Sequence, residues 1–112
     1  MRVFAWSDWN IGHIAAHGVV PAEAEYVVRR ERRPFPEPVG GGKWYVAGKT
    51  AEGRWLQVVY VLLDPENVQP DSLSVADMIA FGEFGAQVAL IIHARELTDD
   101  EKRRIRKRGS SK

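Results

Sequence analysis

Apolar and polar residues at the start of the chain are spaced as in a strand followed by a helix. Residues 3–6 form a short apolar run that predicts a strand. Ser7 or Asp8 can cap a helix that runs to His17 and ends at Gly18. The chain is therefore expected to open with a β–α unit.

A second helix and a β-hairpin follow. Pro21 suits the first position of a helix, whose apolar stripe is formed by Ala24, Val27 and Val28. Residues 43–63 contain two β-rich runs joined by a glycine-containing turn at residues 50–53. This pattern predicts an antiparallel hairpin.

The last part of the chain predicts one more strand and one more long helix. Residues 64–85 begin with turn residues and can hold a short helix at about residues 73–81. Residues 86–95 read as a strand, and Thr98 with Glu101 forms a capping box for a last helix. We expect one α+β domain over all 112 residues, with a small antiparallel sheet packed by two N-terminal helices, an insertion at about residues 64–85 and a basic C-terminal helix.

The charge of the chain is uneven along its length. The net charge is +1, but residues 101–112 contain seven Lys or Arg and one acid, so the preceding residues carry a net charge of −5. A basic end can bind an anion such as nucleic acid, or it can be a solvated end without a partner. The sequence leaves these two readings equally open.

Composition excludes several classes of site. The chain has no cysteine, so it forms no disulfide and no thiolate metal site. No apolar run is long enough to cross a bilayer, and we expect a cytoplasmic protein without a membrane partner.

Strand parity indicates where polar chemistry is exposed. Alternate residues of a strand point to opposite faces, so the last strand should have one wholly apolar face and one face that turns polar at its C-terminal end, formed by Gln87, Ala89, Ile91, His93 and Arg95. Lys43, Tyr45 and Lys49 should likewise share a face of the hairpin, and Arg54 begins its second strand. Each lysine alone reads as an ordinary solvent-facing residue.

Two histidines lie four residues apart on the first predicted helix. His13 and His17 flank the buried stripe around Ile14. A metal site needs a third ligand, and H-x-x-x-H without the internal glutamate of a zinc protease is weak support for one. We expect His17 to pack and cap the helix end, with a functional role for either histidine left open.

Four motifs together resemble a known family. They are W-x-x-x-N-x-x-H-x-x-x-H-G-V at residues 6–19, P-x-E-x-E at residues 21–25, G-x-T-x-x-G-R-x-L at residues 48–56 and A-R-x-L-T-x-x-E-K at residues 94–102. In order and spacing the chain resembles the BrnT-type toxins of bacterial type II toxin–antitoxin systems. The resemblance implies a small α+β ribonuclease fold related to the RelE toxins, an RNA substrate and a neutralising antitoxin encoded nearby.

The chain also departs from that family pattern. The connection before the last strand is long, His93 stands where a Ser or Thr is common, and Ile105 stands where a tyrosine is common. A metal-free ribonuclease needs a proton carrier and cations on the phosphate. We expect His93 to carry protons while Arg54 and Arg95 bind phosphate oxygens, without metal or cofactor.

Further basic and aromatic residues are candidates for RNA contact. They are Lys43, Tyr45, Lys49, Lys102, Arg103 and Arg106. A non-catalytic RNA- or partner-binding module of the same fold would use the same surface without turnover. A structural or assembly protein would instead use its loops as contacts and leave the arginines in ion pairs.

A protein partner is the last expectation. The basic last helix, residues 102–108, and the apolar residues of the insertion are the expected contacts of an antitoxin. A toxin–antitoxin hetero-oligomer or a homodimer would cover these surfaces.

Overall fold

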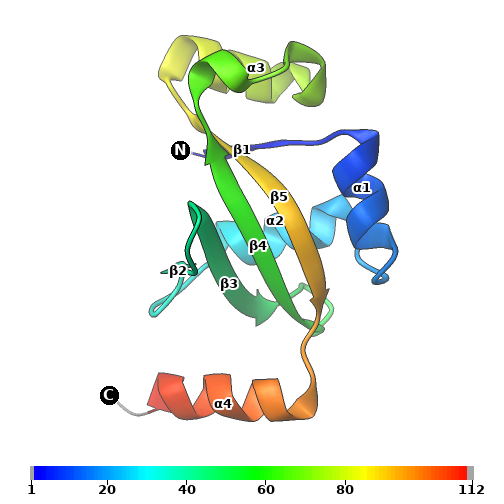
Figure 1. Ribbon diagram of the computed structural model, residues 1–112, viewed down its shortest axis with the longest axis vertical. Coiled ribbons are helices and arrows are strands. Elements are labelled where there is room, and N and C mark those ends of the chain that lie inside the picture. Colours follow the sequence, from blue (N-terminus) through cyan, green and yellow to red (C-terminus); the bar gives the residue numbers. More distant parts are fainter. Residues whose placement is uncertain (1, 111–112) are drawn as a thin grey trace.

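A computed structural model of the protein describes residues 2–110, which form a five-stranded sheet with four α-helices (Figure 1). The elements run β1 (Arg2–Ala5), α1 (Asp8–Ala15), α2 (Pro21–Arg29), β2 (Glu37–Pro38), β3 (Lys43–Lys49), β4 (Trp55–Leu63), two 3₁₀ turns, α3 (Val75–Phe84), β5 (Gln87–Glu96) and α4 (Asp99–Ser110). The expected α+β class is confirmed.

The sheet is mostly, not wholly, antiparallel. Its strand order is β1-β5-β4-β3-β2, and β1 pairs with β5 in parallel while the other neighbours are antiparallel. The expectation of a purely antiparallel sheet is therefore wrong for β1. The two helices that follow β1 free it from hairpin geometry, so it can lie parallel to a strand far along the chain.

The helices divide the sheet into a covered and an open face. α2 crosses one face, α1 lies beside β5, and α3 and α4 lie at opposite ends of the strands (Figure 1). The stripe of α2 is buried as expected, at Ala24, Val27 and Val28. The main core forms where this stripe and Ile14 of α1 meet the apolar face of β3, β4 and β5. On the opposite face of the sheet, α4 borders Tyr45 of β3 and Gln57 of β4 at one end of the strands, and α2 lies on the other side (Figure 1).

The ends of several elements follow local sequence signals. The Ser7 backbone N–H donates to Asn10 Oδ1 at 2.7 Å at the start of α1, and Gly18 has a φ of +73° after it. Thr98 and Glu101 form both hydrogen bonds of the expected capping box, at 2.8 and 3.2 Å. α1 ends at Ala15, two residues before the expected end.

An irregularity in β5 changes which side chains share a face. Val59 pairs with His93 but the next residue, Tyr60, pairs with Ile91, so Ile92 is an extra residue in the ladder. Ile91 and Ala94 therefore both lie in the core. The expectation that Ala89 and Ile91 share a face with His93 and Arg95 is wrong, because the extra residue reverses the alternation.

The insertion forms a second, smaller packed unit. Its inner side, including Leu73, covers Val3, Ala5 and Val88. The outer side of α3 is apolar and exposed, with Val75 at 79% and Phe84 at 71% of full exposure. Among the described residues, no helix is both long and apolar enough to span a membrane.

Candidate functional site

The free edge of β5 is covered by α1. β1 pairs only with the first four residues of β5, and α1 takes its place beside the remainder. Asn10, which is fully buried, fixes this contact because its Nδ2 donates to Ala5 O at 3.0 Å and to Ile91 O at 3.1 Å. Ala5 ends β1, and Ile91 follows the last β5 residue that pairs with β1, so the Asn10 side chain joins helix and sheet at the point where this pairing ends.

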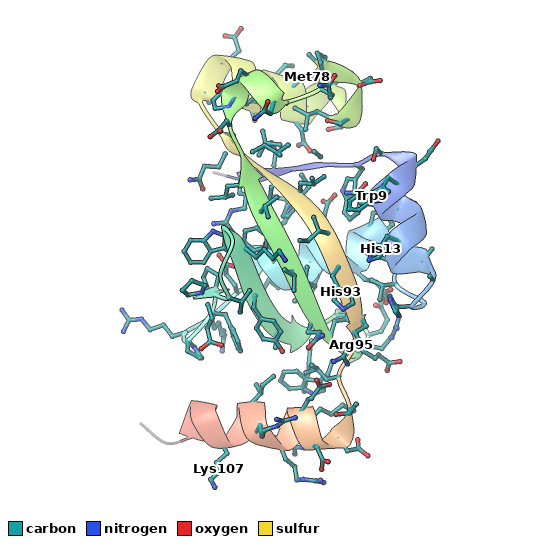
Figure 2. The ribbon with its side chains drawn as sticks, in the orientation of Figure 1. Trp9, His13, Met78, His93, Arg95 and Lys107 are labelled. Carbon is teal, nitrogen blue, oxygen red and sulfur yellow. The ribbon has the colours of Figure 1, made fainter. Side chains whose placement is uncertain are left out.

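The position of α1 beside β5 brings three histidines together, and we name His13, His17 and His93 the histidine cluster. The ring centroids of His17 and His93 are 5.3 Å apart, and His13 lies 6.1 Å from His93 and 6.2 Å from His17. Figure 2 shows His13 on α1 facing β5, which carries His93 and Arg95. His13 and His17 thus lie beside His93, which follows them by at least 76 residues in the sequence.

The helix side of the histidine cluster is fixed by an aromatic contact. The ring of Trp9 stacks on His13 with a centroid separation of 5.7 Å and an interplanar angle of 12°. Trp9 itself is 59% exposed. Such a ring limits the rotamers of His13 and leaves His17 as the less restrained partner of His93.

The environment of His93 favours its neutral form. Burial lowers the pKa of His93, and the nearby His17, Arg95 and His13 lower it further. Burial and nearby cations both penalise the imidazolium. At neutral pH His93 is therefore suited to accept a proton.

Arg95 lies beside His93 on the open face but is fully engaged within the protein. Its Nη1 and Nη2 donate to the two Glu101 oxygens at 2.9 and 2.7 Å, and Nη1 also donates to Glu96 O. In the amide orientation that satisfies both neighbours, Gln57 accepts from Arg95 Nε at 3.0 Å and donates to the Tyr45 hydroxyl. Arg95 can thus supply positive charge and hold neighbouring side chains in place, but its N–H groups already donate to acceptors within the protein.

Arg54, the other expected phosphate ligand, is also held in ion pairs. Its Nη1 donates to Glu23 at 2.8 Å and to Gly18 O at 3.2 Å, and its Nη2 lies 3.6 Å from Glu96. Because Gly18 follows His17, this contact anchors the loop at the end of α1. The geometry supports a positioning role for Arg54 in place of the expected phosphate contact.

The expected RNA-binding residues are spread over several surfaces. Lys43 and Lys49 lie at opposite ends of β3, roughly 20 Å apart at the usual rise of a strand. Tyr45 and Arg95 are joined through Gln57 on the open face. The structure therefore brings Tyr45, and not Lys43, close to the candidate catalytic residues.

On α4, two of the expected cations have acidic neighbours one turn away. Lys102 lies 3.7 Å from Asp99, and Arg103 forms an ion pair with Asp100. Arg106 borders a hollow that also includes Lys49. Intrahelical pairs of this kind are exposed and weak, so the two paired cations are still available to an anion.

Within residues 2–107, no group of three or more His, Asp or Glu side chains is arranged to hold a metal ion. The histidine cluster offers imidazole groups, which in general accept and donate protons near neutral pH.

From the sequence, His13 and His17 are expected to have a structural role before a functional one. Their spacing already put them on one side of a helix, but nothing local indicated that His93 would face them. That proximity depends on α1 replacing a strand at the edge of β5 and on the extra residue Ile92.

Comparison with known proteins adds no relative. No model of a known protein family matches the chain, and no curated protein matches it in sequence. The resemblance to the BrnT-type toxins remains an expectation from the sequence, and function has to be argued from the arrangement of side chains.

Proposed function

We propose that this protein is a metal-independent endoribonuclease, the toxin of a type II toxin–antitoxin pair, with a RelE-like fold. The observation that carries the proposal is the histidine cluster on an exposed surface, with the neutral form of His93 favoured and a second imidazole 5.3 Å away. RNA cleavage through the ribose 2′-hydroxyl needs one base and one acid, and two imidazoles provide both.

The chemical step is an attack of the ribose 2′-oxygen on the adjacent phosphorus. His93 accepts the 2′-hydroxyl proton as the new P–O bond forms. The imidazolium of His17 donates a proton to the 5′-oxygen as the P–O bond to that oxygen breaks, which leaves a 2′,3′-cyclic phosphate and a free 5′-hydroxyl. Burial and then the charges of His17 and Arg95 favour the neutral form of His93, and Arg95 also contacts Gln57, which donates to the Tyr45 hydroxyl.

The pH dependence of cleavage follows from the pKa of His93. A base works only when it is deprotonated, so the acidic limb of the rate profile should lie below the ordinary pKa of histidine. Replacing Arg95 with Gln removes one of the charges that lower the pKa of His93. The acidic limb should then move to higher pH.

A cleavage assay tests the proposal. Purified protein should cut single-stranded RNA equally well with and without EDTA, and His93→Gln should lower the rate by roughly 10²–10⁴. Gln87→Ala, an exposed change on the same strand, is the control and should leave the rate unchanged. Intact RNA with the wild-type protein, or activity lost in EDTA and restored by a divalent ion, would contradict the mechanism.

A second candidate is a non-catalytic RNA-binding module. It is favoured by one observation, that Arg54 and Arg95 are both neutralised by carboxylates and neither is ready to bind a phosphate. RNA that is bound but remains intact would select this alternative.

The proposed partner is the cognate antitoxin. The exposed apolar side of α3, which includes Val75, Ile79 and Phe84, supports a protein contact there, and Met78 projects from the same helix (Figure 2). Co-expression with the adjacent gene product should give a complex, and Ile79→Asp should weaken it without changing the unfolding temperature.

A further inference from the structure

A large hollow lies at the β3 edge of the sheet, away from the histidine cluster. It has a volume of about 990 Å³ and runs from the end of α2 over the free part of β3 to α4. We name it the basic groove and define it by Tyr26, Arg30, Arg32, Arg33, Lys49 and Trp55. β4 pairs with β3 along its whole length, whereas β2 pairs only with Trp44 and Tyr45, so among the described residues the last part of β3 has no strand on its outer edge, which borders the groove.

The basic groove is strongly cationic. Among the described residues, Glu31 is the one acid that borders it, and that carboxylate already accepts from Arg2 at 2.9 Å and from the Tyr60 hydroxyl at 3.4 Å. Among residues 2–107, no carboxylate forms an ion pair with Arg30, Arg32 or Arg33. The chain has 15 acids and pairs other arginines with them, so these cations are left available for a ligand.

Aromatic rings lie among these cations. The Arg30 guanidinium lies over the Tyr26 ring at 4.4 Å, and Lys49 Nζ lies over the Trp55 ring at 5.5 Å. Phe35 also lines the groove. A ligand that carries both anionic groups and flat rings matches such a surface, because phosphates contact the cations while bases stack on the rings.

An extended acidic peptide matches the groove less well. It would use the cations and the free edge of β3, but it offers nothing that stacks on Tyr26 and Trp55. Lys49 also lies on that edge, and an edge lysine opposes the addition of another strand.

We propose that the basic groove binds a short stretch of single-stranded nucleic acid, with its phosphates on Arg30, Arg32, Arg33 and Lys49 and a base on Trp55. The groove adjoins the open face, because Trp55 lies two residues from Gln57 on β4 and Gln57 contacts Arg95. This inference deepens the proposed ribonuclease function by giving its RNA strand a second site, but binding can be measured without cleavage.

The test uses a fluorescent 12-mer of single-stranded DNA, which lacks the 2′-hydroxyl and cannot be cut by the proposed mechanism. The wild-type protein should bind it with an affinity that falls linearly with the logarithm of salt concentration. Arg32→Gln/Arg33→Gln should raise Kd roughly tenfold and make the slope of the salt plot shallower by about 1.4, since each lost phosphate contact on a single strand contributes about 0.7. Both side chains are exposed, so the variant should fold normally.

Matched controls separate local from general charge effects. Gln69→Glu/Gln87→Glu lowers the net charge by the same two units at the opposite end of the sheet and should change Kd less than twofold. Arg32→Lys/Arg33→Lys keeps the charge and should retain most of the binding. Equal losses for the two charge-lowering variants would overturn the proposal.

The stacking role needs its own variant and its own competitor. Trp55→Leu should weaken binding at least about fivefold, whereas Trp55→Phe should retain most of it. A 12-residue polyglutamate peptide should compete poorly. If the peptide competes as well as an unlabelled 12-mer, or if Trp55→Leu has no effect on a folded protein, the groove is a peptide or general anion site and the proposal is wrong.

The same measurements separate this inference from the proposed function. Binding that depends on the groove with no RNA cleavage would leave the groove proposal standing and remove the ribonuclease. Cleavage that depends on His93, with oligonucleotide binding unaffected by the groove variants, would do the reverse.

Discussion

The region beside β5 and the region beside β3 differ in how their arginines are paired. Beside β5, Arg54 and Arg95 each have a carboxylate within 3 Å, and the polar groups are joined into a fixed network. Beside β3, Arg32 and Arg33 have no such partner among the described residues. Fixed, neutralised charge positions reacting groups, whereas available charge binds a polyanion, so we assign chemistry to the first side and binding to the second.

The difference also shows in how each side is built. α1 is held to β5 by a fully buried asparagine, which leaves little freedom to the histidines that it carries. The cations of the basic groove are exposed side chains, and Arg30, Arg32 and Arg33 lie in the segment that follows α2. Catalytic groups need positions fixed to a fraction of an ångström, while contacts to a flexible nucleic-acid backbone do not.

The largest expected effect lies within the histidine cluster. His17→Gln should slow RNA cleavage by roughly 10²–10⁴, because it removes the proposed acid. His13→Gln should cost less, since His13 is stacked on Trp9 and lies farther from His93. Single-turnover rates at saturating RNA measure this directly. A larger loss for Arg32→Gln/Arg33→Gln under the same conditions would break the division between chemistry and binding.

The next largest effect is on stability and concerns the two hydrogen bonds of Asn10 that join α1 to the sheet. Asn10→Ala removes two buried hydrogen bonds, those from Asn10 Nδ2 to Ala5 O and Ile91 O, which should cost about 2–3 kcal/mol of unfolding free energy. For a chain of this length the unfolding temperature should fall by roughly 10 °C.

Ile11→Ala, an exposed neighbour on α1, is the control for that experiment and should change stability by less than about 0.5 kcal/mol. Oligonucleotide binding by the basic groove should survive Asn10→Ala at temperatures where the variant is folded. Equal stability of Asn10→Ala and wild type would mean that the Asn10 hydrogen bonds do not hold α1 to the sheet.

Local spacing was enough to predict several parts of the fold. The stripe of α2, the hairpin of β3 and β4 and the capping box of α4 depend on residues within about one turn or one strand pair of each other. Their side chains meet whatever the rest of the chain does. That is why these elements were predicted with nearly correct bounds.

The candidate site could be predicted only in part, because it depends on long-range register. The residue type and the strand position of His93 predict a proton carrier, and this stays a prediction. The extra residue Ile92 and the replacement of a strand by α1 decide what His93 faces, and neither has a local signal. The ion pairs of Arg54 with Glu23 and Glu96 are equally long-range, so the sequence did not predict them, and its phosphate role stays a prediction.

A third, smaller effect tests whether Arg54 is a positioning residue. A double-mutant cycle with Arg54→Ala and Glu23→Ala should give a coupling free energy of about 0.5–1 kcal/mol, since the pair is partly exposed to solvent. Arg54→Lys cannot reproduce the contacts to both Glu23 and Gly18 and should lose part of the cleavage rate with unchanged KM. An increase in KM with unchanged kcat would instead indicate that Arg54 contacts the RNA.

The smallest expected effect is the pH dependence of α4 docking at the β5 side. The Arg95 guanidinium and the cap at Thr98 lower the pKa of Glu101 to about 2. Because the folded pKa lies below the unfolded value, the ionised Glu101 stabilises the fold above the unfolded pKa, and this contribution disappears as the pH falls from about 4.5 toward 2.

The difference in unfolding free energy between wild type and Glu101→Gln measures this contribution. It should be constant from pH 5 to 7 and shrink steadily below pH 4.5, because a protonated Glu101 pairs with Arg95 no better than a glutamine does. Arg33→Gln, on the β3 side, should give a difference that does not change over the same range, since the described residues place no carboxylate in an ion pair with Arg33. If the difference in unfolding free energy between wild type and Glu101→Gln does not depend on pH, the Arg95–Glu101 charge pair does not hold α4. The paired arginine beside β5 would then not differ in stability from the unpaired arginines beside β3.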